Sequence, residues 1–340
     1  MDMVAAVGDV REIARIAYGF KASKALFTAV DLGLFARLSD GPQTLSTLAA
    51  SMSLAANRLE TLLTALTSLG LLIKDTDGYA NAPACNDYLV PGRPNYFGDY
   101  FRLQTDRLIY PAFGDLTSLI RGDGGSEVWG EYEELMSDAA RAETFSRGQH
   151  AGSLGPAAVL AKHADLSSRE RLLDVGGGSG AFTIMLCRRN PGLRATILDF
   201  PNALYIARNF VDEAGLGDRV TYHEADATTG EWPQGHDVVL MSYLLSAVSA
   251  DAIDDLLDLA HESLPAGGML VVHDFMVDDD QNGPPDAALW FLTCMFNAPD
   301  GVVLTPQRIE QRIEAAGFAD VRIEPLIPDL TRFAMAVKQP

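Results

Sequence analysis

The spacing of apolar and polar positions changes about halfway along this chain of 340 residues. From Arg11 to about Leu72, apolar residues recur every three or four positions, which predicts amphipathic helices. The segment LLIKDTDGYANA follows, and its Asp77-Gly78 pair is typical of a tight turn between two short strands. Helix, turn, helix and hairpin together predict a winged-helix domain over residues 1–90.

The second half alternates short apolar runs with helix-length segments. Residues 91–165 are expected to be mostly helical, linking the domains and lining part of a substrate pocket. After Arg169 come the runs RLLDVGGG, RATILDF, RVTYHEAD, HDVVLMSYLL and GGMLVVHDF. This alternation predicts an α/β fold, a doubly wound, Rossmann-like sheet over residues 166–340. A last helix is expected to begin near Thr305, followed by two closing strands.

Charge narrows the classes of partner. The chain has 26 basic and 46 acidic residues, a formal net charge of −20. Such a surface repels phosphate backbones and anionic lipids, so neither nucleic acid nor a membrane is expected as a partner. The second helix of the winged-helix pattern offers Arg58 as its one basic residue. We therefore expect a dimerisation or lid role for this domain rather than DNA binding.

Cysteine content and hydropathy indicate the cellular compartment. The three cysteines, Cys85, Cys187 and Cys294, are far apart and form no CxxC pair, so neither a zinc cluster nor a disulfide framework is expected. No apolar run is long enough to span a bilayer, and the first residues lack a secretory signal. A cytoplasmic protein without a metal is the expectation.

A glycine-rich turn marks a candidate ligand site. In LLDVGGGSGAF, Gly176, Gly178 and Gly180 lie between a buried strand and a helix that begins near Ala181. Glycine lets a ligand approach the backbone, and the helix start offers free N–H groups to an anion. The pattern alone also fits a nicotinamide dinucleotide.

Acidic residues at successive strand ends indicate which ligand is bound. Asp174, two residues before the first glycine, suits an ammonium group and not a pyrophosphate. Asp199 suits both ribose hydroxyls, and Asp226 suits an adenine amine with Ala227 beside the ring. Ammonium, carboxylate, ribose and adenine together describe S-adenosylmethionine, with S-adenosylhomocysteine as the product. We also assign Ser242, at the end of the fourth strand, to this cofactor site.

With these motifs the chain resembles the class I S-adenosylmethionine-dependent methyltransferases. More narrowly, it is similar over nearly its whole length to small-molecule O-methyltransferases related to the caffeate, acetylserotonin and hydroxyneurosporene enzymes. The resemblance also includes ILDFP, LPAGGMLVV and LTPQRIEQRIEAAGF. It implies a small-molecule substrate and a homodimer formed through the N-terminal domain.

The resemblance fails at the position of the catalytic base. O-methylating members carry a histidine in an LHDW-like motif after the fourth strand, flanked in the plant enzymes by two glutamates. Here the aligned residue is Ser246, and the glutamate counterparts are Asp274 and Val303. A phenol has a pKa near 10, and a positioned base accelerates its methylation by about 10²–10⁴-fold, which serine cannot supply.

Three functions remain open. The first is S-methylation of a thioether acid such as 4-methylthio-2-hydroxybutyrate, as on the route to dimethylsulfoniopropionate, because a thioether has no proton to remove. The second is C- or O-methylation of an aromatic or secondary metabolite with His273, Asp274 or His150 as the base. The third is cofactor binding without methyl transfer. Ser246, His273 and Asp274 are the candidate catalytic residues.

Substrate contacts are expected from two segments that contact the acceptor in similar enzymes. A carboxylate substrate would need an arginine, and Arg147 is the first candidate. The remaining candidate substrate residues are Gln149, His150, Trp290, Phe291 and Met295.

Overall fold

The computed structural model describes residues 6–339, so the ends of the expected segments 1–90 and 166–340 lie outside it. These residues form two compact units, 6–107 and 108–339. The division between the units falls inside the expected linking segment 91–165. Each unit is described by itself.

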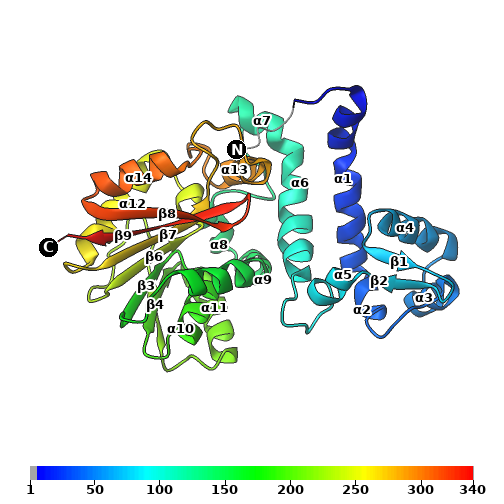
Figure 1. Cartoon of the computed structure of the whole chain (residues 1–340), viewed down its shortest axis with the longest axis horizontal. Helices are drawn as coiled ribbons and strands as arrows, with labels where there is room; N and C mark the ends of the chain where they lie inside the picture. Colours follow the sequence, from blue (N-terminus) through cyan, green and yellow to red (C-terminus); the bar gives the residue numbers. More distant parts are fainter. Residues whose placement is uncertain (1–5, 340) are drawn as a thin grey trace. The chain divides into compact units, whose positions relative to one another are not determined.

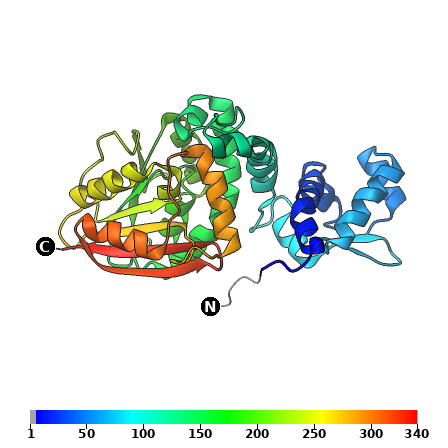
Figure 2. The same cartoon turned by 90° about the horizontal axis from the view of Figure 1, so that it is seen from above.

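The N-terminal unit packs its helices and a short hairpin around one apolar core (Figures 1 and 2). Helix α1 begins where the Asp9 side chain accepts hydrogen bonds from the backbone N–H groups of Arg11 and Glu12. Strands β1 and β2 pair antiparallel beside α4, which confirms the predicted hairpin. The elements are α1 (Val10–Asp31), α2 (Leu34–Arg37), α3 (Leu45–Met52), α4 (Ala56–Ser68), β1 (Leu72–Lys74), β2 (Tyr79–Asn81), α5 (Pro83–Tyr88) and the π-helix η1 (Tyr100–Ile109), which continues into the next unit.

One face of α1 leaves large apolar side chains uncovered. Val10, Ile13, Ile16 and Phe20 follow one another at spacings of three or four residues and are 74%, 55%, 75% and 53% exposed. Such spacing places them on the same side of the helix. A contiguous exposed apolar surface is typical of a site that another molecule covers.

The C-terminal unit contains a seven-stranded sheet in the order β5-β4-β3-β6-β7-β9-β8. The first five strands of this order are parallel, and β9 runs antiparallel to both β7 and β8. This arrangement confirms the predicted doubly wound sheet and its two closing strands. The strands are β3 (Arg171–Val175), β4 (Arg194–Asp199), β5 (Val220–Glu224), β6 (Val238–Ser242), β7 (Met269–Phe275), β8 (Phe318–Ile327) and β9 (Thr331–Lys338).

Helices cover both faces of this sheet, each over its own apolar core (Figure 1). Helices α9, α10 and α11 pack on one face, and α12, α13 and α14 on the other. Thr305 caps α14 by accepting from the N–H of Arg308, as predicted. The helices are α6 (Tyr110–Ala112), η2 (Phe113–Asp115), α7 (Leu116–Arg121), α8 (Tyr132–Ser137), α9 (Ala139–His163), α10 (Ala181–Arg189), α11 (Pro201–Glu213), η3 (Leu245–Ala247), α12 (Ala250–Ser263), α13 (Pro285–Asn297) and α14 (Pro306–Ala315).

Across residues 6–339, none of the helices combines the length and the apolar character that crossing a membrane requires.

A leucine within α4 and the leucine that follows this helix give a matched test of the N-terminal core. Leu63 has no exposed surface, whereas Leu69 is 46% exposed. We expect Leu63→Ala to lower the free energy of unfolding by about 2–5 kcal/mol, because it leaves a cavity. Leu69→Ala should change it by about 0.5 kcal/mol or less. Urea unfolding measures both, and equal losses would contradict the assignment of Leu63 to the core.

Candidate functional site

The glycine-rich turn joins β3 to α10 at the carboxyl edge of the sheet. Gly176 and Gly178 have φ angles of 63° and 52°, a left-handed conformation that favours glycine. Gly177 is required for a different reason. A Cβ atom there would lie 2.8 Å from Cγ of Asp174 and 2.9 Å from Cγ2 of Ile197. The turn therefore fits closely around the Asp174 carboxylate.

Asp174 is a buried carboxylate with one unused oxygen. The side chain is 1% exposed, and its Oδ2 accepts a 2.6 Å hydrogen bond from Oγ1 of Thr183. Its Oδ1 has no hydrogen-bond partner within the described residues. Burial raises the pKa of Asp174 to about 7, although the Thr183 hydrogen bond opposes this rise. A cationic group would bind the unpartnered Oδ1 and favour the negatively charged form of Asp174.

Asp199 ends the neighbouring strand β4 and is 3% exposed. Its Oδ2 accepts from the N–H of Gly178 at 2.8 Å, and its Oδ1 from that of Phe200 at 2.7 Å. The Tyr132 hydroxyl donates to both oxygens, at 3.3 and 3.4 Å. Burial raises the pKa of Asp199 to about 6, and the two backbone N–H groups oppose this effect. Two ribose hydroxyls could take the place of the Tyr132 hydroxyl.

Asp226 lies two residues beyond β5, at the same edge of the sheet. Its Oδ1 accepts from the backbone N–H and the hydroxyl of Thr228, and its Oδ2 from the Thr229 hydroxyl. Asp226 therefore stabilises its own turn, and Ala227 beside it is 9% exposed. The three acidic residues lie at the ends of adjacent strands, as the sequence predicted.

A cavity of about 20 Å³ lies over the glycine turn. This is room for about one water molecule, so a larger ligand requires side chains to move. The predicted cofactor residues Asp174, Gly176, Gly178 and Ser242 line it, and so does Gln149, which was expected at the substrate. The cavity is also lined by Gly177, Ser179, Ala181 and Phe182, which belong to the glycine-rich motif, and by Ser153 and Tyr243, which were not predicted.

These residues fit S-adenosylmethionine. The unpartnered Oδ1 of Asp174 suits its ammonium group, Asp199 its ribose, and the Asp226 turn its adenine. Ser242 lies with Asp174 in the cavity, where the methionyl arm would lie. Among the described residues, no group of three His, Cys, Asp or Glu side chains could hold a metal ion.

Ser246 lies in the short helix η3 and is 5% exposed. Its N–H donates to Oδ2 of Asp274 at 3.0 Å, and the N–H of Phe275 donates to Oδ1 at 2.8 Å. Asp274 has no exposed surface, and burial raises its pKa to about 6, while the Ser246 side chain and the backbone N–H groups oppose the rise. The Asp274 carboxylate thus holds the turn that follows β6.

The two candidate histidines are both neutral near pH 7. His273 has no exposed surface, and its Nδ1 and Nε2 contact the hydroxyls of Ser242 and Thr331 at 2.8 and 3.0 Å. Burial lowers the pKa of His273 to about 3. His150 stacks on Phe210, and its Nδ1 lies 3.1 Å from the Ser179 hydroxyl, while burial lowers its pKa to about 4. To accept a proton from a substrate, His273 would first have to break a hydrogen bond.

A row of packed aromatic rings extends from the cofactor cavity to α13. Phe182 and Tyr243 line the cavity, and Tyr243 packs against Phe275 with ring centroids 4.8 Å apart. Trp290 on α13 stacks on Phe275 at 4.9 Å and 11°. This row of rings places the predicted substrate residue Trp290 two aromatic contacts from the cavity.

The remaining predicted substrate residues are in different environments. Phe291 is 6% exposed in the core between the sheet and α12–α14. Met295 is half-buried and packs against a separate apolar cluster. Arg147 is exposed, and its Nε donates to Glu143 at 2.9 Å. Their roles at a substrate stay predictions.

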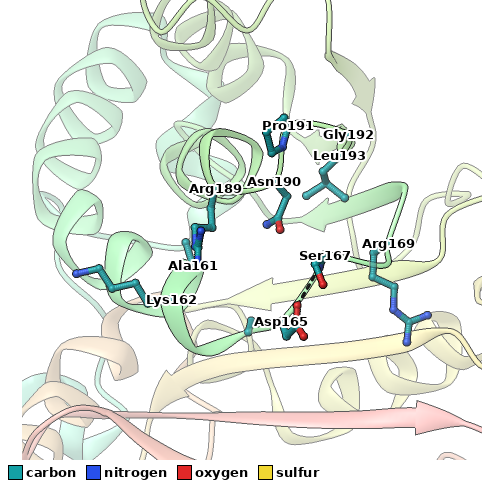
Figure 3. A pocket seen from close by; sticks show the side chains of 11 residues that line it. Ala161, Lys162, Asp165, Ser167, Arg169, Arg189, Asn190, Pro191, Gly192 and Leu193 are labelled. Carbon is teal, nitrogen blue, oxygen red and sulfur yellow. Dashed lines mark hydrogen bonds between the residues drawn. The ribbon is translucent and has the colours of Figure 1, made fainter.

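A larger cavity of about 420 Å³ lies at the opposite edge of the sheet, before β3 and β4 (Figure 3). Lys162, Arg169 and Arg189 line it together with Asp165. Figure 3 shows that Lys162 and Arg169 point away from each other. Because its cations do not converge on a common point, we assign no ligand to this cavity.

Comparisons with known proteins agree with this geometry. A model of the O-methyltransferase domain matches residues 116–319, and a model of the O-methyltransferase dimerisation domain matches residues 14–91. The chain is 34% identical over 308 residues to 3-hydroxy-5-methyl-1-naphthoate 3-O-methyltransferase of Streptomyces sahachiroi, covering 90% of this chain and 89% of the relative. It is 32% identical over 280 residues to N,N-dimethyltransferase OxyT of Streptomyces rimosus, covering 81% of each.

A solved structure of similar fold is human N-acetylserotonin methyltransferase in complex with S-adenosylmethionine. Its TM-score is 0.86 at 23% identity, and the match covers 99% of this chain and 100% of that one.

The raised pKa of Asp174 predicts pH-dependent cofactor binding. Its carboxylate is the form that pairs with an ammonium group, and it is lost as the pH falls below about 7. We expect S-adenosylhomocysteine to bind more tightly as the pH rises from about 5.5 to 8, with proton release on binding. Asp174→Asn should weaken binding at pH 8 by about tenfold or more and flatten this dependence, leaving a step near pH 6 from Asp199.

Titration calorimetry in two buffers of different ionisation enthalpy measures the affinity and the protons released. If Asp174→Asn keeps the wild-type slope, Asp174 does not pair with the ammonium group.

Proposed function

The chain belongs to the O-methyltransferase family of S-adenosylmethionine-dependent enzymes, and we propose that it methylates a small molecule at an atom that carries no proton. The observation that carries this proposal is the environment of residue 246. Ser246 is buried, and the turn around it is held by Asp274. A hydroxyl group cannot serve as the general base that a protonated phenol requires.

A thioether sulfur is the acceptor that best suits such a site. Its lone pair forms a bond to the methyl carbon while the bond from that carbon to the cofactor sulfur breaks. The positive charge passes to the acceptor, and no proton leaves. The protein then has to align the two sulfur atoms and exclude water. We propose a thioether acid such as 4-methylthio-2-hydroxybutyrate, with the stacked rings of Phe275 and Trp290 beside the new sulfonium.

C- or O-methylation of an aromatic metabolite is the second candidate. It is favoured by the 34% identity to an enzyme named for O-methylation of a hydroxynaphthoate. A base would then be needed, and Asp274, His273 and His150 are the candidates. Of these, His150 is the one that retains exposed surface, although its pKa near 4 makes it a weak base.

We also propose that the chain forms a homodimer through its dimerisation domain. Two residues of the apolar face of α1, Ile16 and Phe20, lie within the matched residues 14–91, and Val10 and Ile13 lie just before them. An identical subunit would remove these side chains from water.

The pH profile and the preferred acceptor separate the two candidate reactions, and Ser246→Ala tests whether residue 246 takes part in proton transfer. We expect kcat on the preferred acceptor to stay within about tenfold of wild type, with a rate nearly independent of pH from about 6 to 9, because no proton is transferred. The measurement is methyl transfer from radiolabelled S-adenosylmethionine to a panel of methylthio acids, phenolic acids and amines. His150→Gln, assayed in parallel, tests the candidate base that retains exposed surface.

Three results would contradict the proposal. Transfer confined to phenols with a bell-shaped pH profile would identify a general base, as would a loss of about 10³-fold in His150→Gln. Tight cofactor binding without transfer to any acceptor would favour a protein that has lost the reaction.

Substitution of Ile16 tests the homodimer. Ile16→Glu places a charge on the apolar face of α1 and should shift the protein from dimer to monomer at micromolar concentration, as measured by sedimentation velocity. Ile73→Glu is the matched control, because Ile73 is also exposed, at 49%, but lies on β1. A wild-type monomer, or equal effects of both substitutions, would overturn this interface.

A further inference from the structure

Three side chains form a hydrogen-bonded row that begins at the cofactor cavity. Ser242 ends β6 and lines the cavity. Its hydroxyl lies 2.8 Å from Nδ1 of His273, the residue paired with it on β7. Nε2 of His273 lies 3.0 Å from the hydroxyl of Thr331, the first residue of β9. His273 and Thr331 are 0% and 2% exposed, so water does not replace these contacts.

The histidine in this row can carry its proton on either nitrogen. Burial lowers the pKa of His273 to about 3, so its ring is neutral and one nitrogen donates while the other accepts. In the first arrangement, Nδ1–H donates to Ser242 and the Thr331 hydroxyl donates to Nε2. In the second, Nε2–H donates to Thr331 and the Ser242 hydroxyl donates to Nδ1.

Thr331 decides between the two arrangements. Its hydroxyl oxygen also accepts the N–H of Ile327 at 3.3 Å. Within residues 6–339, Ile327 and His273 are the two hydrogen-bond partners found for this hydroxyl. In the second arrangement both partners donate, and the hydroxyl proton of Thr331 is buried without an acceptor, which costs free energy. The first arrangement satisfies every group.

We propose that His273 and Thr331 are positioning residues that fix Ser242 as a hydrogen-bond donor into the cavity, directed at the carboxylate of the cofactor's methionyl arm. In the first arrangement Ser242 accepts from Nδ1–H, so its own proton is free for a ligand. Asp174 in the same cavity accepts from the ammonium group, so the two residues recognise the two charges of the arm. The inference rests on the proposed function only for the identity of the ligand.

The donor has a clear electrostatic purpose in this chain. A net charge of −20 disfavours an anionic group, and the two buried acids beside the cavity add to that effect. A neutral hydroxyl held as a donor recognises a carboxylate without adding a buried cation. The same hydroxyl held as an acceptor would repel it.

Thr331→Val tests this role, because valine keeps the shape of threonine and removes the hydroxyl. We expect S-adenosylhomocysteine to bind about tenfold more weakly, as for loss of one hydrogen bond to a charged group. Binding of 5′-methylthioadenosine, which lacks the amino-acid arm, should be unchanged. Ser242→Ala should reproduce this pattern, and Thr331→Ser should restore wild-type binding. Calorimetry with both ligands measures these affinities without any methyl transfer.

A second threonine–histidine pair in the same sheet provides the matched control. The Thr196 hydroxyl lies 2.9 Å from Nε2 of His236, which is 7% exposed, and neither residue lines the cavity. Thr196→Val should therefore leave the affinities for both ligands unchanged.

The tautomer gives a readout that a merely structural role would not produce. ¹⁵N chemical shifts of His273 should show a protonated Nδ1 in the wild type and a shift toward protonated Nε2 in Thr331→Val. A protonated Nε2 in the wild type would overturn the proposal. So would equal losses of affinity for both ligands, or no loss for either. If the wild type binds neither ligand, the cofactor assignment fails instead, and the tautomer measurement still decides the orientation of Ser242.

Discussion

Asp174 and Asp199 are carboxylates with almost no exposed surface at the ends of two neighbouring strands. Burial of negative charge is unfavourable unless donors surround it, and both side chains have raised pKa values as a result. The glycine turn supplies part of this compensation, since Gly178 donates to Asp199 and Gly177 leaves room for Asp174. The conformation of the turn, the start of α10 and the affinity for a cationic ligand are therefore linked to the same two charges.

The turn after β6 also contains a buried carboxylate, and here backbone donors bind both of its oxygens. Asp274 has no exposed surface, and backbone N–H groups occupy both of its oxygens. In this chain the Asp274 carboxylate stabilises the backbone of the turn. Ser246 is thus held in place by the Asp274 carboxylate. In the proposed reaction, alignment of donor and acceptor would replace acid–base chemistry.

Local patterns predicted most of the fold and the cofactor side of the site. Alternating strands and helices, the glycine spacing and Asp174 are all readable over a few residues, and the structure places them as expected. The contacts of Tyr132 with Asp199 and of Thr331 with His273 join residues 67 and 58 positions apart, and no local pattern encodes them. His273 was expected as a base because its strand end is readable from sequence. Its complete burial depends on β9, which comes from later in the chain.

The hydroxyl of Tyr132, carried by the six-residue helix α8, occupies the two Asp199 oxygens that a ribose would need. Binding of the nucleoside therefore requires the Tyr132 hydroxyl to leave both oxygens. Association would then be gated: the observed rate constant would level off at high ligand concentration, at the rate at which the Tyr132 hydroxyl leaves Asp199. The residence time of the product would depend on the return of the same hydroxyl to Asp199.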